Sequence, residues 1–445
     1  MANIQSLRRH IFAMSGAFPP VAVFDNHWAP TLAFAYSLGR RGVPLHVYGR
    51  GGGVRWSRYC TVHRPAPPIE DADRFLPWLQ ERVRSGEIAR VAPTTDMMAY
   101  YISCLRDEFP PEVRRTIAPL AEIETALIKS RFSSACAAIG QAVPDSLTPE
   151  SLEEAVSAGH QLGYPLMMKP RSHLVVGSAE RGHLIRDEAA LRARFRRYGV
   201  APGQSGLSER YPELRWPLLQ RYLPSARRRV YSVSGFKDSD GGIVAASLSY
   251  KREQWPPDVG TSTVQISARQ QSVLSAGLRA IDGLVSRGIF ELELVLDGKQ
   301  LLAIDWNPRA FGFINLDIAL GRDLPWLWLC STLGPVAPLT DDTPDVSLEA
   351  RHALLHFLRQ LADRWAGRLK HPSFERRAPG RPRHWISMLG HRSDPVPMIL
   401  GHAKLLQHPR SLLRTHFSTL RAERVRRAEL LQATEECDPA SRPLT

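Results

Sequence analysis

Cysteine is scarce in this chain of 445 residues, which contains only five. They are far apart in the sequence and odd in number, at Cys60, Cys104, Cys136, Cys330 and Cys437. Their spacing includes no CxxC pair, so the sequence favours neither a disulfide framework nor a cysteine metal site. A reducing compartment fits this cysteine usage best.

Long hydrophobic runs are also missing, since no stretch reaches the roughly 18 apolar residues that a membrane-spanning helix needs. The first twenty residues hold only a short apolar patch and no convincing signal-peptide cleavage region. Hydrophobic residues make up 43% of the chain and charged residues 23%, which is typical of globular proteins. We therefore expect a soluble cytoplasmic protein whose length allows two or three domains.

The glycine fingerprint of dinucleotide-binding proteins is absent. The buried-strand pattern VAVFDN (21–26) is followed by a helical segment and a second strand at 44–50, which predicts the opening of a parallel α/β sheet. The turn after the first strand reads DNHWAP instead of GxGxxG, so NAD binding is disfavoured. VAPTTD (91–96) predicts a further strand, and the loop-like composition around Pro144 and Pro149 marks a boundary.

Negative charge is in short supply, because 58 Lys and Arg residues outnumber 44 Asp and Glu residues and give a formal net charge of +14. Arginine-rich patches lie at 192–197, at 227–229 and through much of 351–427. Such a balance predicts an anionic partner, and phosphates, carboxylate substrates, nucleic acid and an acidic membrane surface all fit. Nucleic acid is disfavoured because no zinc-finger spacing or RNA-binding aromatic motif accompanies the patches.

The stretch AIDWNPRAFGFINL (303–316) places an acid, an amide and a guanidinium directly after apolar residues. Asp305, Asn307 and Arg309 alternate, so an extended chain projects all three from one face. Pro308 marks the end or edge of the strand, since proline cannot donate to a sheet ladder. Two oxygen donors and a cation suit a divalent metal ion bridged to a phosphate. A strand that simply turns polar at solvent is the alternative.

A β-hairpin strengthens the metal interpretation. The segment IFELELVLDGKQLLAIDWNPR predicts two strands joined by a tight turn at Asp297 and Gly298. Antiparallel pairing would then bring Glu293 close to Asp305 and Asn307. Three oxygen donors beside an arginine are costly to gather without a cation, so a divalent metal with nucleotide phosphate is the leading interpretation.

A second phosphate-binding element is predicted at the end of GYPLMMKP, where Lys169 follows an apolar strand. A lysine in that position can hold a phosphate as a point charge. The helix before this strand is predicted to begin after Ser151, a residue type that caps helices well. A solvent-exposed strand end is again the alternative.

Several motifs, in their order and spacing, make the chain resemble the ATP-grasp ligases, in particular the carboxylate-amine ligase branch that includes D-aspartate ligase-like proteins. The resemblance covers about residues 20–340 and is carried by ALIKSRFS, GYPLMMKP, LLQRYLP, KREQWPPDVGTST and the ELELVLDG…LLAIDWNPR pair. SMLGHRSDPVPMIL (387–400) is similar to a tail found after the grasp domain in this branch.

The resemblance implies an α/β fold of the α+β grasp type. It implies a pre-ATP-grasp α/β domain at 1–120, a two-lobed ATP-grasp domain at 121–340 and a mainly helical, basic C-terminal extension at 341–445. Within that extension, helices are predicted at about 346–368 and 411–433.

The resemblance also assigns roles to single residues. Lys129 and Lys169 correspond to the lysines that bind nucleotide phosphate. The hinge that borders adenine corresponds to Gln220, Arg221, Tyr222 and Leu223.

For the reacting centre, the resemblance makes Lys251 and Arg252 active-site cations, with Arg309 positioning phosphate or substrate. The magnesium ligands correspond to Glu293, Asp305 and Asn307.

The implied activity is an ATP- and Mg²⁺-dependent ligation in which a carboxylate forms an acylphosphate and an amine then displaces phosphate. Small-molecule acids and amines, such as amino acids or peptides, are the expected substrates. A homodimer and a peripheral contact with an anionic surface stay open.

This chain differs from the usual family pattern at Asp305, where glutamate is usual, and at Arg221, which follows Gln220 where an acid is usual. SHLVVGSAERG (172–182) is poor in glycine for a phosphate flap. Two alternatives therefore stay open: a catalytically degenerate nucleotide-binding module and a basic protein that binds polyanions.

Overall fold

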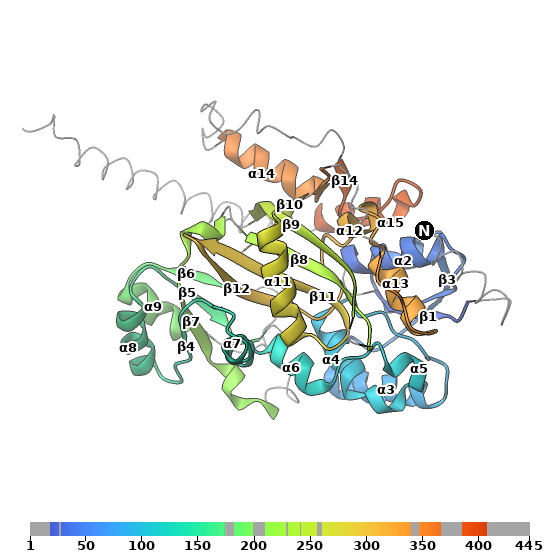
Figure 1. Cartoon of the computed structure of the whole chain (residues 1–445), viewed down its shortest axis with the longest axis horizontal. Helices are drawn as coiled ribbons and strands as arrows, with labels where there is room; N and C mark the ends of the chain where they lie inside the picture. Colours follow the sequence, from blue (N-terminus) through green and yellow to red (C-terminus); the bar gives the residue numbers. More distant parts are fainter. Residues whose placement is uncertain are drawn as a thin grey trace, which may run out of the picture.

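The computed structural model describes most of the chain outside its two ends (Figure 1). The described residues are 18–25, 28–172, 174, 182–198, 210–227, 230–240, 242–255, 260–339, 347–365 and 385–406. They form three β-sheets with helices packed on them. None of the helices in these ranges has the length and apolar character needed to cross a lipid bilayer.

The chain opens with a small parallel sheet of order β1-β2-β3, as the sequence predicts. Its elements are β1 (Val21–Phe24), α2 (Trp28–Gly39), β2 (Leu45–Tyr48), β3 (Cys60–Arg64) and α3 (Ala72–Arg84), with a short 3-10 turn η1 (Val54–Trp56) before β3. The strand predicted at 91–96 is reduced to one parallel bridge between Val91 and Ala22. Thr95 instead caps a helix, because its side chain accepts from the Met98 amide.

A helical layer connects this sheet to the rest of the molecule. It contains α4 (Asp96–Cys104), η2 (Arg106–Glu108), α5 (Pro111–Arg114), α6 (Leu120–Leu127) and α7 (Lys129–Ala138). Lys129 is the first residue of α7. The helix begins there because the backbone of Ile128, the residue before it, is extended.

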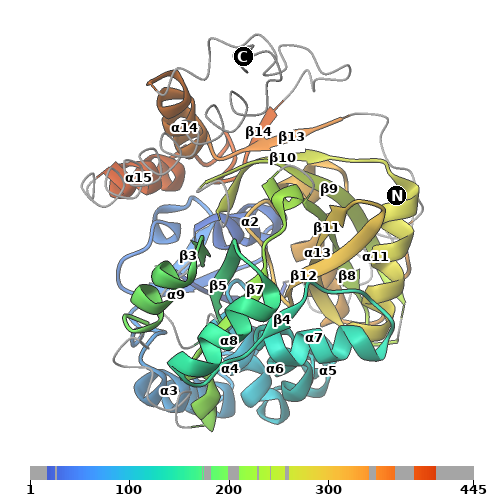
Figure 2. The same cartoon turned by 90° about the vertical axis from the view of Figure 1, so that its left-hand side faces the viewer.

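A four-stranded sheet of order β4-β7-β5-β6 follows, with α8 and α9 covering one side (Figure 2). Its elements are β4 (Ser146–Leu147), α8 (Leu152–Leu162), β5 (Leu166–Pro170), β6 (His183–Ile185), α9 (Glu188–Phe195), η3 (Pro212–Arg215), β7 (Pro217–Arg221) and η4 (Pro224–Arg227). Ser151 caps α8 by accepting from the Glu154 amide, as the sequence predicts. Leu166, Met168 and Leu219 are buried under these helices.

The largest sheet has seven strands in the order β12-β11-β8-β9-β10-β13-β14. Its first part comprises β8 (Val230–Lys237), β9 (Ile243–Trp255), β10 (Thr261–Ser267), α11 (Gln271–Leu284), β11 (Gly288–Asp297) and β12 (Gln300–Asn307). The predicted hairpin is present, and Gly298 makes its turn with a φ of 60°, a backbone conformation that glycine adopts without strain.

The last part of the described chain extends this sheet and adds four helices. Its elements are α12 (Asn315–Ala319), α13 (Leu324–Ser331), β13 (Glu349–Arg351), α14 (Ala353–Trp365), β14 (Trp385–Ser387) and α15 (Pro395–Leu406). The helix predicted from about 346 therefore starts later, because 349–351 pair with β10 as a strand. The helix predicted at 411–433 lies outside the described residues.

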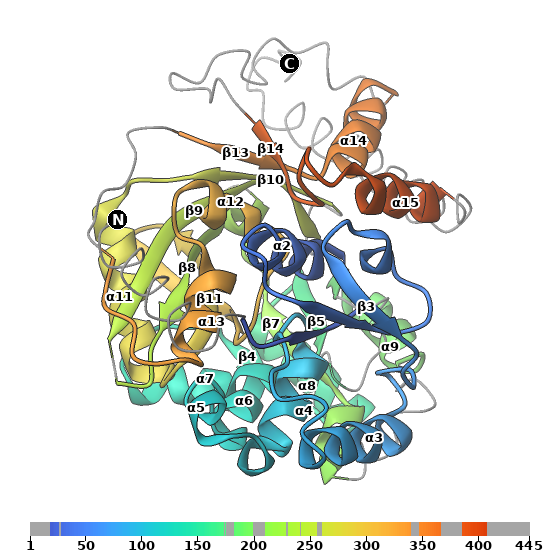
Figure 3. The ribbon, with the colours of Figure 1, turned by 90° about the vertical axis from the view of Figure 1, so that its right-hand side faces the viewer.

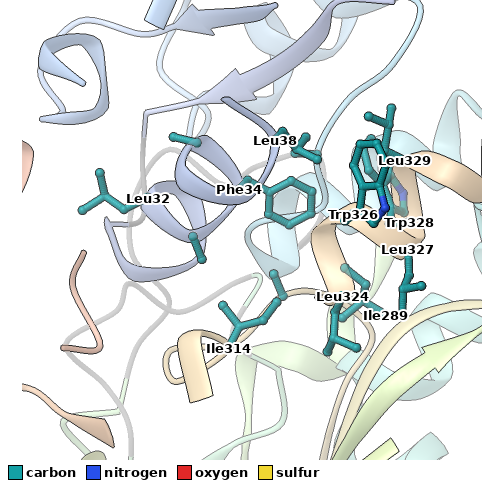
Figure 4. Close-up of a cluster of buried hydrophobic side chains, with 14 of the residues drawn as sticks. Leu32, Phe34, Leu38, Ile289, Ile314, Leu324, Trp326, Leu327, Trp328 and Leu329 are labelled. Carbon is teal, nitrogen blue, oxygen red and sulfur yellow. The ribbon is translucent and has the colours of Figure 1, made fainter. Parts of the chain in front are cut away.

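A hydrophobic cluster ties the parallel sheet to the large sheet (Figure 4). Phe34 of α2 packs edge-on against Trp328 of α13, with ring centroids 5.6 Å apart. Polar contacts close the same junction, because Arg40 and Arg41 each bind Asp323 at 2.7 Å. Strong burial on both sides holds the parallel sheet and α2 against the large sheet that carries the candidate site.

Candidate active site

Four polar residues project from one face of the β11–β12 hairpin. Glu291 pairs with Asn307 and Glu293 pairs with Asp305 in the antiparallel register. Between Asp305 and Ala303 the register shifts by one residue at Ile304, a local bulge that turns the end of β12. Trp306 points the other way and is buried in the core beneath the hairpin.

Two lysines from distant segments meet these carboxylates. Lys129 Nζ donates to Asp305 Oδ1 at 2.9 Å, and Lys251 Nζ on β9 donates to Glu293 Oε1 at 2.9 Å. Burial alone would lower the pKa of Lys251, but the Glu293 carboxylate outweighs it and the pKa is raised. Lys251 therefore stays charged, and acids and cations alternate across a few ångströms.

Lys169 at the end of β5 lies in the same neighbourhood but contacts an amide instead of an acid. Its Nζ donates to Gln220 Oε1 at 2.8 Å, and Gln220 in turn donates to Ser146 Oγ at 2.9 Å. Burial, with the nearby charge of Lys129, lowers the pKa of Lys169 to about 8. Among the described residues no carboxylate forms an ion pair with Lys169, so this partly buried ammonium is suited to an incoming anion.

Arg309 joins the hairpin to the first domain. Its guanidinium makes a two-pronged ion pair with Asp96 at 2.8 and 3.0 Å and also donates to Asn307 Oδ1 at 2.8 Å. The next residue continues the link, because the Ala310 amide donates to the Pro93 carbonyl at 2.9 Å. Burial disfavours the charged guanidinium, yet Asp96 outweighs it and raises the pKa of Arg309.

A pocket opens where these segments meet. Its lining residues are Asp96, Ala126, Leu127, Lys129, Asp305, Trp306 and Asn307. Acidic, amide and cationic groups thus share one wall with apolar side chains, the mixture expected of a small-molecule site.

Two residues of this constellation do not appear among the residues predicted from sequence. Glu291 is buried and accepts from Asn307 Nδ2 at 2.7 Å. Burial, reinforced by the charge of Glu293, holds the pKa of Glu291 well above its usual range. The sequence carried one signal for Glu291: it lies two residues before Glu293, so both side chains lie on the same face of the strand. Asp96 carried no such signal, because its partner Arg309 is 213 positions away.

The remaining predicted residues are placed less centrally. Arg252 pairs with the buried Glu349 of β13 at 3.4 Å. Arg221 lies on the opposite side of β7 from Gln220, where it binds Asp297 at 3.3 Å.

The other two predicted hinge residues, Tyr222 and Leu223, come directly after Arg221 in the sequence. Leu223 packs in a small apolar cluster with Val230, Val295 and Leu302, and Tyr222 before it is half-buried. Residues 173 and 175–181 of the predicted phosphate flap and residues 256–259 of the loop KREQWPPDVGTST lie outside the described residues.

The donor set fits magnesium held jointly with phosphate. In the part of the chain that the structure describes, no three His, Cys, Asp or Glu side chains gather closely enough to hold a metal ion alone. Two carboxylates and an amide on paired strands, Glu293, Asp305 and Asn307, offer oxygen ligands only. Mg²⁺ prefers such ligands and usually shares its coordination with water and substrate phosphates.

Sequence comparison finds distant relatives. No protein-family model matches the chain. The carbamoyl phosphate synthase large chain of Pyrococcus furiosus is 25% identical over 221 residues, which are 48% of this chain and 19% of that protein. The large chain from Hyperthermus butylicus is 28% identical over 201 residues, or 43% of this chain and 17% of that one. The match thus spans about a fifth of these relatives.

Solved structures cover more of the chain. Biotin carboxylase of Campylobacter jejuni, in a β,γ-ATP complex, superposes with a TM-score of 0.57 at 12% identity and covers 74% of each chain. The biotin carboxylase domain of Hydrogenobacter thermophilus 2-oxoglutarate carboxylase, with MgADP and bicarbonate, gives 0.58 at 12% identity over 74% of this chain and 73% of that one.

A ligase is also among the similar structures. The L-amino acid ligase of Bacillus licheniformis gives a TM-score of 0.52 at 15% identity, covering 74% of this chain and 79% of that one. Together with the four-stranded and seven-stranded sheets and the helices that connect them, these superpositions establish that the chain has the ATP-grasp fold.

Proposed function

We propose that this protein is an ATP- and Mg²⁺-dependent carboxylate-amine ligase that forms an amide or peptide bond. One observation carries the proposal: Glu293 and Asp305 face each other across β11 and β12, and each contacts a lysine at 2.9 Å. Such a set of alternating charges can exchange its internal ion pairs for Mg²⁺ and phosphate at little electrostatic cost.

The nucleotide would lie between the four-stranded sheet and the hairpin. Lys129 and Lys169 would bind phosphate oxygens, and the hinge from Gln220 to Leu223 would border adenine. The side-chain positions support the first and last members of the hinge best, since Gln220 contacts Lys169 and Leu223 is apolar and buried.

Glu293, Asp305 and Asn307 would hold Mg²⁺, which when bound would neutralise charge on the phosphates and orient them. Glu291 holds the amide of Asn307, so we assign it a positioning role. The pairing of Arg252 with Glu349 supports a similar positioning role for Arg252, in place of direct contact with substrate.

Catalysis in this arrangement is mainly positioning and charge neutralisation. The substrate carboxylate attacks the terminal phosphorus of ATP, the bond to ADP breaks, and an acylphosphate results. Arg309 and Lys251 stabilise the negative charge on the transferred group. The amine then attacks the acyl carbon, phosphate leaves, and the amine loses a proton to solvent. No nucleophilic side chain is required.

The L-amino acid ligase is the similar structure whose named reaction suits this scheme, and its similarity favours amino acids as the first substrates to test. The experiment is to screen pairs of amino acids for phosphate release in the presence of Mg²⁺ and ATP. We expect release that requires both an acid and an amine, together with a product whose mass is the sum of the two minus water.

A matched pair of variants makes this screen decisive. Asp305→Asn should abolish release, while Asp240→Asn, at the exposed turn between β8 and β9, should leave it unchanged. ATP binding without acid- and amine-dependent turnover would overturn the ligase proposal in favour of a nucleotide-binding module.

A further inference from the structure

Helix α15 exposes the apolar side that a surface helix normally buries. Val396, Ile399, Leu400 and Ala403 recur at the spacing that places them on one face of the helix, and all four are exposed. Ile399 is 59% exposed and Val396 48%. This face, the α15 stripe, is therefore a continuous apolar ridge directed at solvent.

The opposite side of α15 is firmly attached, so the stripe has a fixed orientation. The buried carboxylate of Asp394, just before α15, accepts hydrogen bonds from the Ser57 hydroxyl and from the Arg58 amide. Met398 contacts the Ser387 hydroxyl of β14 at 3.7 Å through its sulfur. These contacts hold the helix against both the first domain and the large sheet.

The elements next to α15, which include β14 and α14 (Figure 3), carry exposed aromatic residues. Trp56 of η1, which contacts α15, is 55% exposed. Trp385 of β14 is 47% exposed and has the guanidinium of Arg351 over its ring at 5.5 Å, and Phe357 of α14 is 56% exposed. Tryptophan and arginine in such positions are typical of the boundary between water and lipid.

The net charge of the protein is concentrated in this part of the sequence. Residues 351–427 contain 17 Lys and Arg residues and four Asp and Glu residues, so they carry +13 of the formal +14. Apolar residues on a fixed helix combined with a strongly basic segment are the two features that peripheral membrane binding requires.

We propose that the α15 stripe and its flanking tryptophans dock the protein on an anionic lipid surface. A second copy of the chain fits less well, because two strongly basic segments would have to approach each other. The chain's own residues 411–433 fit less well for the same reason, since that segment is also rich in arginine. Nucleic acid would satisfy the charge and could stack on the exposed tryptophans, but it would leave the aliphatic side chains of Val396, Ile399 and Leu400 in water, whereas a lipid surface buries them.

The test is sedimentation of the full chain with two kinds of vesicle, one of pure phosphatidylcholine and one of equimolar phosphatidylcholine and phosphatidylglycerol. We expect binding to the anionic vesicles that weakens as salt rises. Replacing both Ile399 and Leu400 by Ser should weaken this binding roughly tenfold or more. Ile139→Ser, an exposed apolar residue at the end of α7, is the matched control and should bind as wild type does.

Charge is tested separately with Arg392, which is exposed just before α15. Arg392→Gln should weaken anionic binding severalfold, and Arg392→Lys should restore most of it. Equal binding to both vesicles, no binding to either, or an undiminished affinity of the double serine variant would overturn the proposal. So would a dimer in sedimentation equilibrium that the serine variant dissociates, or RNA binding that this variant also loses.

Discussion

Glu293 on β11 lies directly opposite Asp305 on β12, and each carboxylate is held by a different lysine at 2.9 Å. Lys251 reaches Glu293 from β9, which is separated from β11 by β8 in the same sheet, whereas Lys129 reaches Asp305 from the start of α7. The two acids are thus joined by the backbone ladder and neutralised from two separate parts of the chain. The proposed chemistry requires Mg²⁺ to replace these two lysines as the partner of the Glu293 and Asp305 carboxylates.

Substitutions at Asp305 test whether this residue is a metal ligand or only an ion-pair partner of Lys129. Asp305→Asn keeps the size of the side chain but removes a negative charge that would balance Mg²⁺, so turnover should collapse. Asp305→Glu keeps the charge and should retain activity. Magnesium titrations of ATP turnover for these two variants and wild type measure the effect, and three superimposable curves would refute the metal assignment.

The two phosphate lysines are expected to contribute unequally to nucleotide binding. Lys169→Ala removes a partly buried ammonium that donates to the Gln220 amide oxygen, and should weaken ATP binding by about 1.5–3 kcal/mol. Lys129→Ala should cost less, because it also frees Asp305. Calorimetry with ATP measures both, and Lys299→Ala at the exposed hairpin turn is the control. Unchanged affinity in both site variants would mean that the nucleotide binds elsewhere.

Lys169 should also set a pH dependence of nucleotide binding. Its pKa is lowered to about 8 by burial and by Lys129, and a bound polyphosphate would raise it again by favouring the charged form. Binding should therefore take up protons above about pH 8, and affinity should fall as the pH rises from there. Calorimetry in buffers of different ionisation enthalpy counts the protons. Lys169→Met should lose this uptake, and a variant that kept it would assign the titration to another group.

The ion pair between Asp96 and Arg309 is predicted to couple the first domain to the active site. Asp96→Asn should lower turnover more than ATP affinity, because it releases the guanidinium that faces the transferred group. The double-mutant cycle with Arg309→Gln should give a coupling free energy of about 1–3 kcal/mol in kcat/KM. Additive effects of the two substitutions would mean that the pair is incidental to catalysis.

The sequence was informative wherever the relevant contacts are local. The hairpin that carries Glu293 and Asp305 could be predicted from alternation and the Asp297–Gly298 turn. Its register at the site could not, because the turn alone would set Glu293 opposite Ile304, and a bulge at Ile304 places it opposite Asp305. The cap at Ser151 and the strand ending at Lys169 follow from equally short patterns.

Contacts between distant segments could not be predicted in this way. Asp96 and Arg309 are 213 positions apart, and no periodicity links them. The same limit applies to β13 and β14, which have three residues each. β13 becomes a strand by pairing with the edge of β10, and β14 then pairs with β13. Local propensity across 346–352 favoured a helix, and the sheet edge outweighed it.

The order of the seven-stranded sheet limits a distance within the molecule. β12, which carries Asp305, is one edge, and β14, which contacts α15, is the other. Six inter-strand steps of about 4.8 Å give a path of about 29 Å along the sheet, which is the upper limit of their separation because the sheet twists. A hydrogen-bonded sheet is stiff, so a protein resting on a bilayer through α15 would hold its reacting centre at a set height. A lipid-linked substrate would need a spacer of up to that length, while free amino acids would reach the same centre from solution.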